Sequence, residues 1–218
     1  MKKTLIGLVI TMFSFASASA EIGVNIGISG NAALFAATAT ELDTGTHGTT
    51  TDGDEKDSES DFLGAAYGSV FIEGEMGPIL LGVDFVPSSL DTETSTNEVQ
   101  DGGSVVTNTV KVSFNDLTTA YVGLKIMENA YVKVGAVTVD LVTEENLGTG
   151  STYGDTSVDG SMIGVGVGHT MDNGIFLRAE ATYMEFDSVS LTSSSGSQKI
   201  TLNSLDGVSG KVSIGKSF

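Results

Sequence analysis

The residues best suited to acid–base chemistry are two histidines, His47 and His169, in a chain of 218 residues that has no cysteine. Without cysteine, the sequence excludes a disulfide framework, a thiolate zinc site, an iron–sulfur cluster and thiol catalysis. His169 has no serine within two positions and shares the alternating phase of Val165 and Val167, which we expect to face outward. His47 lies in a Gly/Thr-rich stretch without a fixed partner. We therefore expect no enzyme.

Two other segments resemble ligand-binding motifs. Glycine occupies every second position from Gly164 to Gly168, but a phosphate-binding loop needs a following helix, and here an extended pattern continues. We expect these glycines to leave room for bulky neighbours. The acidic run from Asp52 to Glu59 lacks the ligand spacing of an EF-hand. A solvated loop and loose divalent-cation binding, bridging to lipopolysaccharide, are its two readings. We expect no cofactor and no built metal site.

The charge balance narrows the class of partner. The chain has 28 Asp and Glu against 10 Lys and Arg, a formal net charge of −18. Binding to nucleic-acid phosphates needs a basic surface, so we expect no nucleic-acid partner. Only 17% of the residues are charged and 40% are hydrophobic, which is too apolar for a disordered acidic chain. The sequence indicates one folded domain.

The hydrophobic pattern has a period of two. Ile22, Val24, Ile26 and Ile28 alternate with small or polar residues, as in a strand with one apolar face. The same alternation recurs along the chain and predicts eight strands, at 22–38, 62–76, 79–87, 109–126, 130–142, 161–171, 175–186 and 205–218. In the strand at 109–126 we place Val112 and Phe114 on the same outward phase as Val122.

The connections between these strands alternate in length. Tight turns are expected at Met76–Pro78, Met127–Asn129 and Asp172–Gly174, where Asn and Gly favour hairpins. Long polar stretches follow the other strands, at Glu41–Asp61, Ser88–Asn108, Thr143–Gly160 and Asp187–Ser204. Long loops on one side and short turns on the other are typical of an up-and-down barrel in an outer membrane.

The two faces of the strands indicate which solvent each one meets. The strand charges fall on the small and polar phase, so the apolar phase has to face something other than water. In hydrocarbon every backbone polar group needs a protein partner, which a sheet supplies only when it closes. We therefore predict an all-β fold, a single closed antiparallel up-and-down transmembrane β-barrel of eight strands, with long extracellular loops and short periplasmic turns, over residues 21–218.

The first twenty residues have the features of a secretory signal peptide. Lys2 and Lys3 precede an apolar run of 11 residues from Leu5 to Phe15, and Ala18-Ser19-Ala20 fits a cleavage site. We expect residues 1–20 to be removed by cleavage after Ala20, and the protein to be exported.

The predicted lumen carries four acidic and four basic side chains. An eight-stranded barrel is just wide enough for side chains to fill it, and buried charge is costly unless it is paired. We expect a cross-barrel salt-bridge network that plugs the lumen; a narrow, charge-lined path for small solutes is the alternative. The network residues are Glu73, Glu75, Asp84, Lys125, Lys133, Arg178, Glu180 and Lys211.

The C-terminal strand carries a resemblance to a known family. Phe218 ends a run in which Val212 and Ile214 alternate with polar residues, and the Phe176–Glu180 strand follows a tight turn. In these features the chain resembles small outer-membrane barrels of the OmpA/OmpX type and opacity-like, porin-family surface proteins. The resemblance implies that Val212, Ile214 and Phe218 are an assembly signal for the barrel-assembly machinery. We expect Lys216, which stands where such proteins carry an apolar residue, to reach the periplasmic head groups.

The resemblance and the pattern together give a functional hypothesis. We expect a monomeric envelope protein in the bacterial outer membrane, surrounded by outer-membrane lipids and lipopolysaccharide. Its lumen would be filled with charge and its acidic loops would lie outside the cell. The alternatives are a narrow porin-like channel and a surface adhesin or binding protein.

Overall fold

The computed structural model describes residues 22–43, 55–101, 104–146, 152–194, 196 and 198–218. In this part of the chain the secondary structure is all β. The strands are β1 (Gly23–Asp43), β2 (Glu55–Met76), β3 (Ile79–Phe85), β4 (Leu90–Asp91), β5 (Ser95–Asp101), β6 (Ser104–Met127), β7 (Ala130–Asn146), β8 (Thr156–Thr170), β9 (Ile175–Phe186), β10 (Val189–Thr192) and β11 (Gln198–Ser217). No helix in the described residues is long and apolar enough to cross a membrane.

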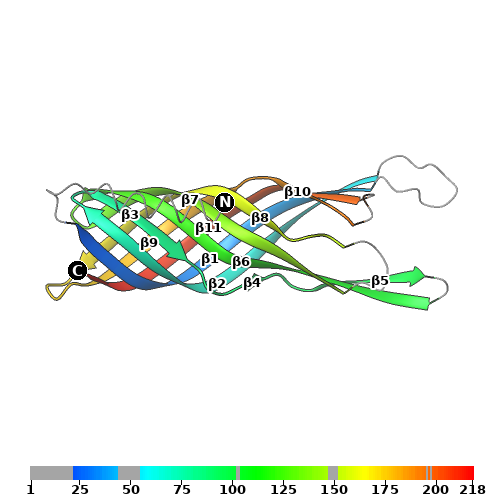
Figure 1. Ribbon diagram of the computed structural model, residues 1–218, viewed down its shortest axis with the longest axis horizontal. Coiled ribbons are helices and arrows are strands. Elements are labelled where there is room, and N and C mark those ends of the chain that lie inside the picture. Colours follow the sequence, from blue (N-terminus) through cyan, green and yellow to red (C-terminus); the bar gives the residue numbers. More distant parts are fainter. Residues whose placement is uncertain (1–21, 44–54, 102–103, 147–151, 195, 197) are drawn as a thin grey trace.

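Eight of the strands form a closed antiparallel ring. Its order is β1-β2-β3-β6-β7-β8-β9-β11, and pairing of β11 with β1 closes it. The short strands β4 and β5 pair with β6, and β10 pairs with β11. The strands wind obliquely around an elongated barrel (Figure 1). This ring confirms the predicted all-β fold, a closed antiparallel barrel of eight strands. We call the end with the tight turns after β2, β6 and β8 the turn end, and the opposite end the loop end.

The outer face of the barrel is apolar and the inner face at the turn end is polar. Ile28 is 60% exposed and Val212 65% exposed, whereas Asn25 and Glu73 are each 1% exposed. On β2, Phe62, Val70 and Ile72 are exposed, so the predicted phase of this strand is correct. A globule in water has the reverse arrangement, with its apolar residues inside.

Glycines on the inner face make room for aromatic rings. Each of five lies directly opposite an aromatic residue on a neighbouring strand. A Cβ at Gly27, for example, would lie 2.6 Å from Cε1 of Phe71. The expectation that the glycines before His169 accommodate bulky neighbours is met at Gly166, where a Cβ would collide with the ring of Tyr131. The pairs are Gly27–Phe71, Gly82–Tyr121, Gly166–Tyr131, Gly207–Phe35 and Gly215–Phe176.

The strands continue further into the long connections than predicted. β1 and β2 stay paired as far as Asp43 and Glu55, and β7 extends to Asn146. Hydroxyl side chains join these extensions, as between Thr38 and Ser60 at 3.0 Å. Threonine favours extended backbone, and cross-strand hydroxyl pairs stabilise a sheet. Polar composition was therefore a poor guide to where the strands end.

A bulge in β6 overturns the single phase predicted for this strand. Between Asn115 and Thr118 two residues face one residue of β7, and Asp116 has a φ of 55°. The bulge shifts the alternation, because one extra residue exchanges the two faces of a strand. Val112 and Phe114 consequently pack against the interior cluster and do not share the outward phase of Val122.

The loop-end half of the lumen is apolar, in contrast to the polar interior that we predicted. Phe35, Met184 and Phe186 lie there on the inner faces of their strands, with further aliphatic side chains. The apolar core of the barrel thus lies above the charged layer. Its buried members are Phe35, Val86, Leu117, Val137, Val139, Leu141, Val158, Met162, Met184, Phe186 and Leu205.

Candidate functional site: the charged lumen

The structure places all eight of the predicted lumen charges in ion pairs. Arg178 Nη2 lies 2.9 Å from Glu73 Oε1. Lys133 Nζ lies 2.7 Å from Glu180 Oε2, and Lys211 Nζ lies 2.5 Å from Asp84 Oδ2. The fourth pair joins Lys125 to Glu75 nearer the turn end. In each pair the two residues come from strands that are not neighbours in the ring, so the pairs join separate parts of the wall.

Further hydrogen bonds satisfy the most deeply buried carboxylate. Glu73, 1% exposed, accepts a hydrogen bond from Asn25 Nδ2 at 2.9 Å and another from Tyr121 Oη at 3.0 Å, in addition to its contact with Arg178. A buried ion pair is stable only when its remaining lone pairs and protons have partners. The polar side chains around Glu73 meet this requirement.

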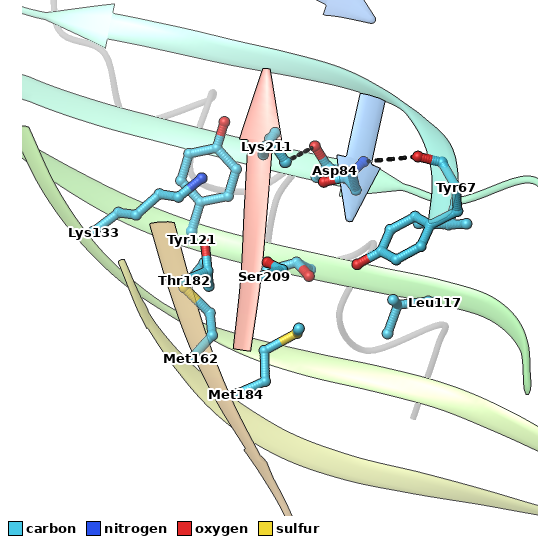
Figure 2. A pocket seen from close by; sticks show the side chains of 13 residues that line it. Tyr67, Asp84, Leu117, Tyr121, Lys133, Met162, Thr182, Met184, Ser209 and Lys211 are labelled. Atoms are coloured by element: carbon cyan, nitrogen blue, oxygen red, sulfur yellow. Dashed lines mark hydrogen bonds and ion pairs between the residues drawn. The ribbon is translucent and has the colours of Figure 1, made fainter. Parts of the chain in front are cut away.

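Two of the pairs are linked into one network. Glu180 lies between Lys133 and Lys211, with Lys211 Nζ 3.7 Å from Glu180 Oε2, and Lys211 continues to Asp84. Tyr131 Oη donates a hydrogen bond of 2.5 Å to Glu180 Oε1. The Lys211–Asp84 contact appears as a dashed line in Figure 2, which looks into the lumen from close by. Four side chains from four strands therefore share their charges across the barrel.

Aromatic rings cover the cations of this layer. Lys133 Nζ lies 4.6 Å from the centroid of Tyr121, beside which it is drawn in Figure 2, and the Arg178 guanidinium lies 4.5 Å from that of Phe176. Cations over ring faces are attracted by the ring quadrupole, more strongly where water is excluded. The rings therefore stabilise the charge and also fill space that water would otherwise occupy.

Two cavities flank the charged layer. One of about 200 Å³ at the turn end is lined by Glu75, Lys125, Arg178 and His169 among others. The second, of about 30 Å³, lies between Lys133 and Lys211 on one side and the apolar core on the other. Figure 2 shows Met162, Met184 and Leu117 on that apolar side. The smaller cavity has room for about two water molecules, and the apolar core follows it toward the loop end.

The three residues of the predicted assembly signal lie at the end of the last strand. Val212, Ile214 and Phe218 are 65%, 49% and 73% exposed on the outer face. The backbone N–H of Phe218 donates to Val24 O at 2.9 Å, so the last residue is part of the ladder that closes the ring. Lys216 Nζ donates to the carbonyl of Asn173 at 3.0 Å, at the turn end.

Of the other candidate chemical groups, His169 is exposed near the turn after β8 and lines the turn-end cavity together with Glu75 and Lys125. His47, residues 52–54 of the acidic run, and residues 1–20 lie outside the described residues. Among the described residues, no group of three or more His, Asp or Glu side chains could hold a metal ion.

The uncharged partners of the network and the apolar core were not among the predicted site residues. Tyr121 and Tyr131 share the inward phases of Lys125 and Lys133, and this spacing was the available signal. Apolar residues on the inner phase at the loop end of several strands, such as Phe35 and Met184, could likewise have indicated the core.

The comparisons with known proteins return remote likenesses in structure alone. No protein-family model and no curated protein matches the chain. The attachment invasion locus protein Ail of Yersinia pestis, in complex with sucrose octasulfate, aligns over 88% of this chain and 99% of its own at 12% identity, with a TM-score of 0.37. The outer membrane protease OmpT of Escherichia coli aligns over 93% and 99% at 10% identity, TM-score 0.39. A FadL homologue of Pseudomonas aeruginosa aligns over 91% and 90% at 7% identity, TM-score 0.27.

Proposed function

We propose that the chain is an envelope protein of the bacterial outer membrane, a β-barrel whose lumen is plugged and whose acidic loops lie outside the cell. The observation that carries the proposal is the pairing of all eight lumen charges beneath an apolar core. A conducting pore needs a continuous polar path. In the described part of the lumen, the paired charges and the aromatic rings around them fill the turn-end half, and the methionines of the apolar core lie on their loop-end side.

The outer face supports the membrane location. Exposed apolar side chains alternate with inward ones on β1, β2, β6, β8, β9 and β11. Apolar residues that face outward on every side of a ring suit hydrocarbon, in which a closed barrel also satisfies its backbone polar groups. On this proposal outer-membrane lipids and lipopolysaccharide surround a monomer. The protein reaches the membrane through a signal peptide cleaved after Ala20 and through the barrel-assembly machinery.

A conductance measurement on refolded protein tests the plug. Purified protein without residues 1–20 is refolded into detergent, inserted into planar lipid bilayers and examined for current steps. We expect none above the background of the bare bilayer. A variant in which Met162, Met184 and Phe186 are all replaced by Ala should begin to conduct if the apolar core contributes to the closure. The matched control replaces Ile163, Val165 and Val167 on the outer face by Ala.

Regular single-channel steps from the unmodified protein would overturn the plug and favour the narrow channel. Insertion has to be verified in the same bilayers, for example by protease protection of the strands. The channel alternative has a specific basis in the two cavities on either side of the charged layer.

The binding-protein alternative rests on a different feature. The hairpin of β5 and the start of β6 extends past the rest of the described barrel at the loop end (Figure 1). An adhesin would lose attachment to its partner when this hairpin is shortened, whereas a structural barrel would keep its membrane yield and show no other change.

A further inference from the structure

The wall of the barrel has a gap between two of its strands. β2 pairs with β1 along its whole length, but on its other edge it pairs with β3 only from Val70 to Met76. Above that point the chain that follows β3 pairs with β6 instead, through β4 and β5. The edge of β2 from Phe62 to Ser69 therefore has no strand partner among the described residues. We call this gap between Phe62–Ser69 and Val86–Asp91 the seam.

The sequence at the end of β3 explains why the pairing stops. Pro87 has no backbone N–H and is confined to strand edges and ends. The backbone donors on either side of it point to β6, since Val86 N–H donates to Leu117 O and Thr92 N–H donates to Val112 O, each at 2.9 Å. The segment from Val86 to Asp91 is thus attached to one side of the seam only.

One backbone donor of the free edge has a side-chain partner. The N–H of Phe62 donates to Asp61 Oδ1 at 2.7 Å. Elsewhere in the ring, separating two strands would break a run of ladder hydrogen bonds, each costly to lose in hydrocarbon. At the seam the two edges can part without breaking a ladder bond.

The seam opens toward the apolar outer face. Phe62, at one end of the seam on β2, is 70% exposed, and Val70, the first residue beyond its other end, is 46% exposed. Between them the outward positions of β2 are occupied by Gly64, Ala66 and Gly68, so the wall there has little side-chain cover. If the barrel lies in a membrane as proposed above, the molecules in front of this part of the wall are lipids.

An apolar pocket lies directly behind the seam. Leu63 of β2 and Leu90 of β4, from its two edges, line the pocket together with Phe35, Phe114, Leu117 and Phe186, and every lining residue is apolar. The pocket measures about 20 Å³, room for about one water-sized sphere. An occupant larger than that can enter only when Leu90 moves outward, and β4, which holds it, is two residues long.

We propose that the seam is a lateral opening through which the acyl chain of a membrane lipid enters the apolar part of the lumen, with the Val86–Asp91 segment as its lid. The inference rests on the proposed outer-membrane location. The occupant is an acyl chain because the pocket lining offers no polar partner for a head group and because the seam faces the lipid-exposed side of the wall. The head group would stay outside, near the loop end of the barrel.

Photo-crosslinking in lipid vesicles tests this proposal. The probe is a phosphatidylcholine with a diazirine on one acyl chain, mixed into vesicles that contain the refolded protein, and peptide mass spectrometry locates the adducts. We expect adducts on the outer face, for instance on Val165, and additional adducts on the inward residues Phe114 and Leu117. A free fatty acid that carries the same diazirine, added from solution, is the comparison that separates membrane lipid from dissolved fatty acid as the source.

A reversible lock makes the test specific. Because the chain has no cysteine, Leu63→Cys with Leu90→Cys introduces one thiol on each side of the seam. Closing this pair, by a disulfide or a short bis-maleimide, should lower the inward adducts at least tenfold while the outer adducts stay unchanged; reduction of the disulfide form should restore them. The matched control is Ser161→Cys with Glu185→Cys, exposed direct partners on β8 and β9. Closing that control pair should not alter either set of adducts.

The two sets of adducts also separate the two proposals. Outer adducts without inward ones, in protein whose gel mobility changes on boiling as a folded barrel's does, overturn the seam proposal and leave the membrane location standing. Inward adducts that survive closure of the lock equally exclude the seam as the route. Absence of adducts on the outer face as well would contradict the membrane location itself.

Discussion

Arg178 on β9 and Glu73 on β2 form a buried ion pair of 2.9 Å although β1 and β11 separate their strands in the ring. Their side chains are 10% and 1% exposed. The pair therefore links, across the lumen, two strands that share no ladder hydrogen bonds. Removing it tests whether the gain from pairing the two charges exceeds the cost of burying them.

Replacing one partner of this pair should be strongly destabilising. Glu73→Gln leaves Arg178 charged and buried without its counter-ion, and breaking a buried pair in this way typically costs about 3–5 kcal/mol. The measurement is the free energy of unfolding in urea for protein refolded in lipid vesicles. The control Glu185→Gln removes a carboxylate from the exposed face of the same barrel and should stay within about 0.5 kcal/mol of the parent protein.

A double variant separates the pair from its surroundings. With Arg178→Met added to Glu73→Gln the uncompensated charge disappears, so part of the lost stability should return. If the double variant were as unstable as the sum of the two single ones, the ion pair would carry no coupling energy and the network would be a collection of independent groups.

The second prediction concerns space in the lumen. A Cβ at Gly207 would lie 2.6 Å from the ring of Phe35, its direct partner on β1. Gly207→Ala should therefore destabilise the barrel by about 1–3 kcal/mol through overpacking. Gly210→Ala on the same strand is the matched control, because its Cβ would have no atom within 4 Å. Urea unfolding compares the two variants.

A compensating change tests the cause. If the ring of Phe35 is what Gly207→Ala displaces, the cost of the alanine should be smaller in a Phe35→Leu background than in the parent protein. Equal costs in the two backgrounds would point to backbone strain in β11 in place of a side-chain collision.

The alternation of residue types was sufficient to predict the ring and the faces of most strands. Ile28 and Asn25 differ in phase, and this difference alone separates the outer face from the lumen. The eight charges could be placed inside for the same reason. Their pairing could be predicted without knowing the strand register, because buried charges of opposite sign are expected to pair in a lumen of this width.

The features that the sequence did not reveal depend on contacts between distant segments. The β6 bulge at Asp116 is defined only by the register with β7. The seam arises because the backbone N–H groups of Val86 and Thr92 bond to β6 and not to β2. The apolar core is built from residues of several strands that are far apart in the sequence. The alternation within any single strand does not show that these residues meet.

The third prediction uses the ion pair between the lid and Lys111 of β6, which stands sixteen residues before the end of this strand at Met127 and thus beyond the about 9–11 residues that a strand needs to cross a membrane. Lys111 Nζ lies 2.9 Å from Asp91 Oδ2. The hydrogen bond from Lys111 lowers the pKa of Asp91 below its ordinary value, and the same bond raises the pKa of Lys111. In Lys111→Met the pKa of Asp91 should rise toward the ordinary value of about 3.9. A carboxyl-detected NMR titration of the two proteins measures the difference.

Because the pKa of Asp91 is lowered, the lid should loosen only in acid. A carboxyl whose pKa is lowered by folding contributes stability above its unfolded pKa and loses it as the pH falls through the folded value. Hydrogen exchange of the lid, normalised for the intrinsic effect of pH, should therefore be constant around neutral pH and increase below about pH 4. Asp91→Asn should abolish this increase. An equal increase in that variant would assign the acid sensitivity to another group.

The last prediction separates a role of Phe218 in assembly from a role in stability. The backbone of this residue closes the ladder with Val24, while its side chain is 73% exposed on the outer face. Phe218→Ala keeps the backbone bonds, so refolding in vitro and the urea midpoint should change little. If the exposed ring is read by the assembly machinery, the amount of folded protein in the outer membrane of cells should nevertheless fall severalfold. Val208→Ala, also exposed on the outer face of β11 but distant from its end, should keep the parent's yield. A yield unchanged by Phe218→Ala, or one that falls only in step with stability in vitro, would remove the assembly role.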